Sequence, residues 1–224
     1  MAQAAMKEPL IIDYYTDILC VWAWIAQRRV DELNSQLGSK IALRYQYVDV
    51  FGDLAGKMQS LWKDRGMFEG FADHVHKAAS GFEDAPVNSR IWNEVRPATS
   101  ATAHLVLKAV ENTAGSDASV QLALSIRKAF FADAQDIGVL SVLFDVCQEA
   151  DLDLDEIKLS INDGSAMASL MGDYRRAHDQ KIKGSPSYVI DNGRQTLYGN
   201  VGYRVLYANI EEVLKHPKDA ASWC

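Results

Sequence analysis

The sequence has few cysteines, no long apolar run and none of the common phosphate-binding or metalloprotease motifs. Its three cysteines, Cys20, Cys147 and Cys224, are an odd number and lie far apart, which is not typical of a disulfide framework. No apolar run could span a bilayer, and residues 1–9 lack the apolar core of a signal peptide. Glycine-rich phosphate loops, HExxH and GxSxG are absent. We therefore expect a cytoplasmic protein with reduced thiols, no metal site and no tightly bound cofactor.

The sequence also has fewer basic residues than acidic ones. The chain has 23 Lys and Arg against 30 Asp and Glu, a net charge of −7, and a pI of about 5.2. This balance argues against nucleic acid or an anionic membrane surface as a partner. With 224 residues and 48% hydrophobic content, the chain can bury a sizeable core as one enlarged domain or two.

The most informative stretch places Cys20 between a strand and a helix. Residues 10–15 form an apolar and aromatic run of strand length, and residues 16–17 are turn and N-cap types. Apolar residues then recur at helical spacing from Trp22 to Leu37, and Gly38 is a suitable stop. Cys20 therefore lies at a predicted helix N-terminus.

A helix N-terminus favours a reactive thiol. Its unpaired N–H groups and the helix dipole stabilise a thiolate, so the thiol pKa is expected below its ordinary value of about 8.5. Residues 18–24 contain no carboxylate that would oppose this shift. The alternative is a small buried cysteine packed behind the strand. Ala23 stands where a Cys-x-x-Cys motif would have its second thiol, so no disulfide can close within the motif.

The rest of the chain predicts an interrupted α/β domain. Residues 41–50 alternate as a strand, which completes a parallel strand–helix–strand unit. Helical spacing dominates residues 60–181, with helices expected at 97–110, 120–131, 139–150, 155–161 and 166–178. Strands follow at 187–191 and 194–198, joined by a type I′ turn at Asn192-Gly193, and a last helix spans 203–214. We expect one domain from residues 1–59 and 182–216, a helical insertion domain at 60–181, and a tail at 217–224.

This order resembles the DsbA-like branch of the thioredoxin superfamily, and most closely its relatives among kappa-class glutathione transferases and 2-hydroxychromene-2-carboxylate isomerases. Two segments carry the resemblance, Asp17-Ile18-Leu19-Cys20-Val21-Trp22-Ala23-Trp24 and Gly184-Ser185-Pro186-Ser187-Tyr188-Val189. The resemblance implies a thioredoxin-like α/β fold with a large all-helical insertion. It also implies that Pro186 is cis and lies against the active thiol, with the backbone of Ser185 available to an extended thiol substrate or to glutathione.

The sequence departs from the family at two places. Dithiol members have a second cysteine where this chain has Ala23, and the transferase and isomerase relatives have serine in place of Cys20. Those relatives also have an Asp-Arg pair after a late glycine, where this chain has Gly199 and Asn200. A helix N-terminus in this region could still hold a glutathione carboxylate. The resemblance thus assigns catalysis to Cys20, and substrate or glutathione binding to Trp22, Ser185, Pro186, Gly199 and Asn200.

Three functions remain open from the sequence. The leading interpretation is a thiol–disulfide oxidoreductase that works through Cys20 alone, acting on a small-molecule thiol or a protein disulfide with glutathione as co-substrate. The second is a glutathione transferase or isomerase, in which Cys20 only stabilises the sulfur of glutathione. The third is a binding module without turnover. A homodimer is compatible with each.

The remaining candidates have ordinary explanations. Cys147 lies on the apolar face of a helix and is expected in the core, and Cys224 is expected to be an exposed thiol. His104 is interpreted as an ordinary helix residue. Asp13 is either a buried carboxylate that assists proton transfer at Cys20 or a residue at a strand edge or end.

Overall fold

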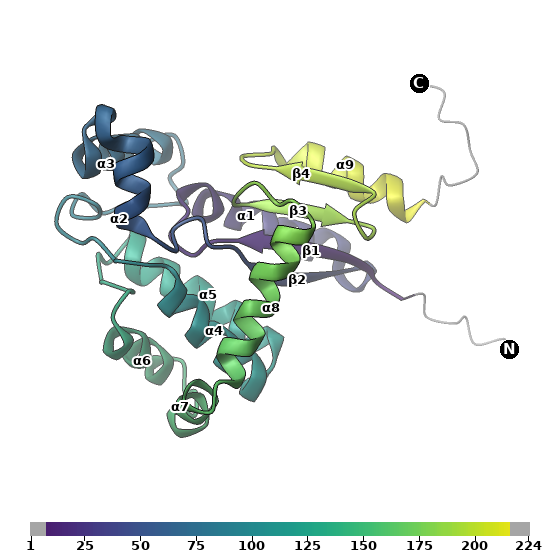
Figure 1. The fold of residues 1–224 in the computed structure, drawn as a ribbon. Helices are drawn as coiled ribbons and strands as arrows, with labels where there is room; N and C mark the ends of the chain where they lie inside the picture. The colour runs from purple at the N-terminus through teal and green to yellow at the C-terminus, as the bar shows by residue number, and fades with distance from the viewer. Residues whose placement is uncertain (1–7, 216–224) are drawn as a thin grey trace, which may run out of the picture.

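The computed structural model describes residues 8–215. At its centre is a mixed four-stranded sheet with strand order β2-β1-β3-β4 (Figure 1). Strand β1 pairs in parallel with β2 and antiparallel with β3, which in turn pairs antiparallel with β4. The strands span β1 Leu10–Thr16, β2 Ile41–Tyr47, β3 Ser187–Ile190 and β4 Gln195–Tyr198.

The predicted strand–helix–strand unit is confirmed. Helix α1, Val21–Leu37, ends at Gly38, whose φ of 50° is in the left-handed region that glycine adopts easily. Strands β1 and β2 pair in register from Leu10 with Ile41 to Thr16 with Tyr47. The second strand was expected to continue to residue 50, but it stops where β1 stops, because no neighbouring strand remains to accept its hydrogen bonds.

Helices fill the chain between β2 and β3, as expected from the spacing. Helix α8 covers one face of the sheet, and α1 and α9 cover the other (Figure 1). Besides α1, the α-helices within the described residues are α2 Leu54–Lys57, α3 Met67–Ala79, α4 Ala101–Ala114, α5 Ser116–Phe131, α6 Leu140–Glu149, α7 Leu154–Asn162, α8 Ser165–Asp179 and α9 Tyr203–Leu214. A π-helical turn spans Met58–Trp62, and short 3-10 helices span Gly38–Lys40 and Lys63–Arg65.

The helix predicted for residues 97–110 begins later than expected. Its first residue is Ala101, because the preceding backbone is paired with the segment after β2. The Ala98 carbonyl accepts the Leu54 N–H at 3.3 Å, and the Ser100 N–H donates to the Phe51 carbonyl at 3.0 Å. These bonds fix the helical insertion to the loop that follows β2.

The turn predicted at Asn192-Gly193 is wrong in length. Ile190 pairs with Gln195, so the hairpin has the four-residue connection 191–194. Asp191, Asn192 and Gly193 all have left-handed backbone, with φ of 51°, 54° and 94°. A two-residue type I′ turn uses only two such residues, so the third lengthens the loop by moving Asp191 out of the strand.

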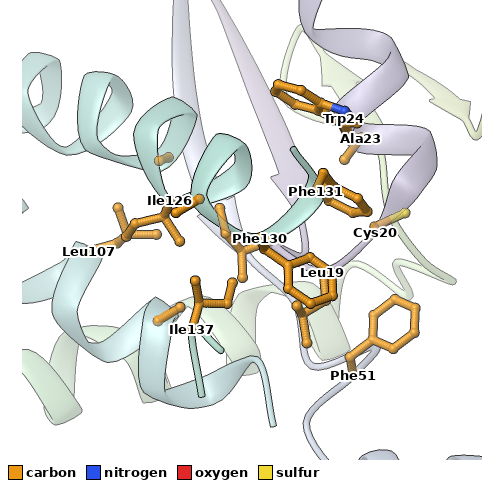
Figure 2. Close-up of a cluster of buried hydrophobic side chains, with 14 of the residues drawn as sticks. Leu19, Cys20, Ala23, Trp24, Phe51, Leu107, Ile126, Phe130, Phe131 and Ile137 are labelled. Atoms are coloured by element: carbon orange, nitrogen blue, oxygen red, sulfur yellow. The ribbon is translucent and has the colours of Figure 1, made fainter. Parts of the chain in front are cut away.

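The largest buried cluster lies between α1 and the helical insertion (Figure 2). It contains Leu19, Cys20, Phe51 and Phe131, and it also contains Cys147, which is 0% exposed and confirms the predicted core position. No helix within residues 8–215 is long and apolar enough to cross a membrane. The predicted tail at 217–224, with Cys224, lies outside the described residues.

Candidate functional site

Cys20 lies at the N-terminus of α1, as the sequence predicted, and is its N-cap residue. Its backbone is extended, with φ −79° and ψ 115°, and its carbonyl accepts the first helical N–H groups, those of Ala23 and Trp24, at 3.1 Å. The side chain is only 5% exposed and belongs to the main buried cluster, which Figure 2 shows around Cys20, Leu19 and Phe131. The thiol therefore combines a helix N-terminus with an apolar surrounding.

Ser185 and Pro186 lie against this thiol. The Cys20 Sγ donates a hydrogen bond to the Ser185 carbonyl oxygen at 3.2 Å, and the Ser185–Pro186 peptide bond is cis, as the resemblance implied. The Ser185 hydroxyl accepts the Asp17 N–H at 2.9 Å. Ser185 thus offers its carbonyl to the thiol proton, and its hydroxyl proton is free to approach the sulfur.

Burial raises the pKa of the Cys20 thiol above its ordinary value. The Ser185 hydroxyl and the N–H groups of Ala23 and Trp22 act in the opposite direction, and the charge of Asp17 adds to the rise. This result corrects the acid-shifted thiol expected from the sequence. The helix N-terminus is present, but the loss of solvent around the sulfur outweighs it.

A buried carboxylate that the sequence did not single out organises the loop around the thiol. Asp17 is 0% exposed, and its oxygens accept the Leu19 N–H, the Phe51 N–H and the Ser100 hydroxyl, each at 2.9 Å. With the bond from its own N–H to Ser185, Asp17 joins the cysteine loop to three segments distant in sequence. Burial raises its pKa to about 6, although these donors oppose the shift.

His104 supports the same loop from helix α4. Its Nε2 accepts the Ile18 N–H at 3.1 Å, which requires the neutral ring with its proton on Nδ1, where the Tyr174 hydroxyl lies at 3.0 Å. Burial lowers the pKa of His104 to about 3, so the ring stays neutral near pH 7. His104 is therefore a support of the cysteine loop and not the ordinary helix residue that the sequence suggested.

Lys57 brings a positive charge to the same region. Its ammonium group donates to the Val50 carbonyl at 3.1 Å and lies 4.7 Å from the centre of the Phe51 ring. Burial lowers the pKa of Lys57, while the charges of Asp17 and Cys20 act to raise it. Lys57 is thus a cation beside the loop after β2, and its charge interacts with those of Asp17 and Cys20.

The other predicted site residues differ in how they are connected to the loops around the thiol. The Gly199 N–H donates to the Pro186 carbonyl at 2.8 Å, so Gly199 lies beside the cis proline. Trp22 is half-buried against the main cluster. Asn200 accepts a hydrogen bond from the Arg29 guanidinium and is not the cap of α9, whose N-cap residue is Gly202. The structure therefore joins Ser185, Pro186 and Gly199 to Cys20 and holds Asn200 on the flank of α1.

A groove of about 510 Å³ opens along α1, one turn beyond the thiol. It is lined by Trp24, Arg28, Arg29, Phe82, Asp84 and Tyr203, among others.

Asp13, the carboxylate considered from the sequence for proton transfer at Cys20, is bound instead by Arg44 of β2 at 2.7 and 2.9 Å. No group of three or more His, Cys, Asp or Glu side chains within residues 8–215 is arranged to hold a metal ion.

Comparison with known protein families and curated proteins shows what this chain is similar to. The family model described as "DSBA-like thioredoxin domain" matches residues 11–211. A curated relative, the ClpXP adapter protein SpxH of Bacillus subtilis (strain 168), is 24% identical over 188 residues, which are 83% of this chain. The chain spans only 60% of the length of that relative.

Three solved structures share the architecture. A protein of Nitrosomonas europaea assigned as a protein disulfide isomerase has a TM-score of 0.76 at 13% identity, over 93% of this chain and 98% of its own. The cytosolic disulfide reductase DsbM of Pseudomonas aeruginosa with GSH has a TM-score of 0.66 at 16% identity, over 92% and 100%. A 2-hydroxychromene-2-carboxylate isomerase has a TM-score of 0.65 at 16% identity, over 95% and 100%. Identities this low show the fold alone, and they confirm the expected thioredoxin-like α/β fold with a helical insertion.

Proposed function

Because the chain belongs to the DSBA-like thioredoxin family, we propose that it is a thiol–disulfide oxidoreductase that works through the single thiol of Cys20. Its substrate is a small-molecule disulfide or a protein disulfide, and glutathione is the resolving thiol. Ala23 removes the second thiol of a dithiol motif, so the chemistry is limited to mixed disulfides.

One observation carries this proposal: the Cys20 sulfur lies 3.2 Å from the carbonyl oxygen of Ser185, directly before the cis proline. An extended substrate that pairs with the backbone at residue 185 would bring its own sulfur close to Cys20. In the described residues the Ser185 N–H has no hydrogen-bond partner, so it is available to such a substrate.

The proposed reaction begins with loss of the thiol proton. The Cys20 thiolate attacks one sulfur of a substrate disulfide R–S–S–R′, which forms Cys20–S–S–R and releases R′–S⁻. The thiolate of glutathione then attacks the Cys20–S–S–R bond at the R sulfur, which forms R–S–S–glutathione and returns the Cys20 thiolate. Both steps exchange one disulfide bond for another, so no external oxidant is needed.

The buried, protonated thiol makes the resting enzyme slow to react. A substrate that takes over the Ser185 carbonyl would remove the acceptor of the thiol proton. The first-turn N–H groups, the Ser185 hydroxyl and the ammonium group of Lys57 would then favour the thiolate. In this way reactivity at Cys20 would depend on an occupied substrate site.

Glutathione and a cytoplasmic location are supported by relatives with the same fold. The Pseudomonas aeruginosa reductase is described as cytosolic and has a structure with GSH. We infer the same compartment here, where glutathione is abundant and protein thiols are reduced.

A second function has its own supporting observation. Because the Cys20 thiol keeps its proton and donates a hydrogen bond, it could equally donate to the thiolate of bound glutathione. Cys20 would then act as serine does in the transferase and isomerase relatives. In that case glutathione, and not Cys20, would be the nucleophile.

Intact-protein mass spectrometry separates these functions. In a background that lacks Cys147 and Cys224, oxidised glutathione should add about 305 Da to the protein, as expected for a mixed disulfide at Cys20. The Cys20→Ser variant should form no adduct and should not turn over a glutathionylated substrate. A matched control, Cys147→Ser in the wild-type chain, should keep both properties, because Cys147 lies on α6 and is 0% exposed.

Each alternative result identifies a different function. Glutathione binding without an adduct, together with transferase or isomerase activity that survives Cys20→Ser, would support the second function. The absence of adduct, glutathione binding and turnover would reject both enzymes and leave a binding module, a role consistent with the adapter named among the relatives.

A further inference from the structure

One aromatic side chain is exposed beside the cis-proline loop. Tyr198 is the last residue of β4, the edge strand of the sheet (Figure 1), and it is 58% exposed. Every other Phe, Trp or Tyr side chain within residues 8–215 is buried or half-buried. A single exposed apolar side chain is ordinary on a protein surface, so the contacts of Tyr198, and not its exposure, indicate a role.

Tyr198 lies directly against Gly184, two residues before the cis proline. A Cβ atom at residue 184 would be 2.8 Å from the Tyr198 hydroxyl oxygen and 3.0 Å from its ring atom Cε2, closer than such atoms normally approach. The ring therefore rests on backbone that a larger residue would cover. The strand that carries it is fixed, because Tyr198 is paired with Ser187 and the next N–H, that of Gly199, donates to the Pro186 carbonyl at 2.8 Å.

The backbone next to the ring offers a donor to a substrate. The Gly184 carbonyl accepts the Ser187 hydroxyl at 2.8 Å, and the Ser185 carbonyl accepts the Cys20 thiol at 3.2 Å. The Ser185 N–H has no partner within the described residues. Residues of an extended chain are about 3.3 Å apart. A substrate paired at residue 185 would therefore bring the residue next to its cysteine to the level of Gly184 and the Tyr198 ring.

We propose that Tyr198 is a specificity-determining residue, which selects protein or peptide disulfides that have a large apolar or aromatic residue next to the reacting cysteine. A fixed aromatic ring offers apolar contact area at little cost in entropy. Glutathione has no apolar side chain beside its cysteine, so it gains little from the ring. The inference rests on the proposed function, because the Cys20 thiol and the Ser185 backbone define where the substrate cysteine lies.

Two glutathionylated peptides test this preference. They are identical except that the residues on both sides of the cysteine are Phe in one peptide and Gly in the other. Affinity is measured by fluorescence anisotropy with the Cys20→Ser, Cys224→Ser double variant, in which neither position can exchange with the disulfide. The result is therefore independent of turnover. The Phe peptide should bind about tenfold more tightly than the Gly peptide.

Three further variants, each made in that double variant, locate the contact. Tyr198→Ala should remove the preference by weakening binding of the Phe peptide alone. Tyr198→Phe should keep it, because the ring and not the hydroxyl makes the contact. Leu159→Ala is the matched control: it removes a side chain that is 57% exposed on α7, at the end of the helical insertion away from β4 (Figure 1), and should leave the preference unchanged.

Three results would overturn the inference. They are equal affinities for the two peptides before Tyr198 is changed, a preference that survives Tyr198→Ala, and an equal loss for both peptides in Tyr198→Ala, which would show that the ring only supports the loop. Turnover by the wild-type chain is measured separately. A binding preference without turnover would reject the proposed oxidoreductase and keep the Tyr198 contact, and turnover without a preference would do the reverse.

Discussion

Two buried carboxylates near the ends of β1 and β2 are stabilised in different ways. Asp173 of α8 accepts the Tyr47 N–H at 3.1 Å and forms ion pairs with Lys108, at 3.3 Å, and with Arg176. Within residues 8–215, the Asp17 carboxylate accepts hydrogen bonds from two N–H groups and a hydroxyl, and its nearest ring nitrogen, the neutral His104 Nε2, is 3.9 Å away. Burial raises the pKa of both carboxyls, but full charges oppose the rise at Asp173 and mainly hydrogen bonds oppose it at Asp17.

The difference separates a structural ion cluster from a group that can change its charge. Removing Lys108 or Arg176 would leave the buried negative charge of Asp173 with one positively charged partner fewer. Asp17 has a pKa of about 6, so its carboxyl group gains or loses its proton when the pH changes around that value. The region around the thiol is therefore the more sensitive of the two to pH, and the region around Asp173 is the more sensitive to loss of a partner.

The largest effect is expected at the ion cluster. Lys108→Met should lower the free energy of unfolding by about 3–5 kcal/mol, because it leaves the fully buried Asp173 with one cation fewer. Urea unfolding gives the value. Arg90→Met is the control, since it removes an exposed pair with Glu94 and should cost less than about 1 kcal/mol. Equal losses in the two variants would contradict the proposed difference between the carboxylates.

A smaller, pH-dependent effect is expected at Asp17. Its pKa of about 6 in the folded protein is above the ordinary 3.8, so folding favours the protonated form. The resulting stabilisation is complete below about pH 4 and is lost as the pH rises through 6, a change of up to about 3 kcal/mol. The free energy of unfolding of the wild type, relative to Asp17→Asn, should fall by that order between pH 4 and 7. A difference that is constant with pH would show that Asp17 keeps an ordinary pKa.

The smallest effect concerns the thiol itself. Alkylation of Cys20 by iodoacetamide, in a background without Cys147 and Cys224, should have its midpoint above the ordinary thiol pKa. Asp17→Asn should lower this midpoint, because the Asp17 charge disfavours the thiolate. A midpoint that stays the same or rises would mean that Asp17 acts on Cys20 only through the shape of the loop.

Local patterns were sufficient to predict the elements that carry the site. The strand, loop and helix around Cys20, the parallel partner strand and the last helix all follow from apolar spacing and from Gly38. The cis bond before Pro186 came from the resemblance and not from spacing. The four-residue hairpin loop was missed because Asn192-Gly193 fits a shorter turn equally well in sequence.

Long-range polar contacts could not be predicted. Asp17 was expected to cap a turn, and nothing in residues 10–24 indicates that Phe51 and Ser100 donate to it. His104 lies in an apolar helix, where spacing alone predicts burial but not its bond to Ile18. The pKa of Cys20 was predicted in the wrong direction for the same reason, since its burial depends on helices far along the chain.

The bond between Cys20 and Ser185 spans 165 residues, and this separation matters during synthesis. At about 5–20 residues per second, Ser185 is added roughly 8–33 s after Cys20. During that interval the nascent chain contains β1 and α1 but neither β3 nor the segment that carries the acceptor of the thiol proton. The thiol is therefore most exposed to oxidants while the protein is still on the ribosome, and its protection is completed only after Ser185, in the last quarter of the chain, has been translated.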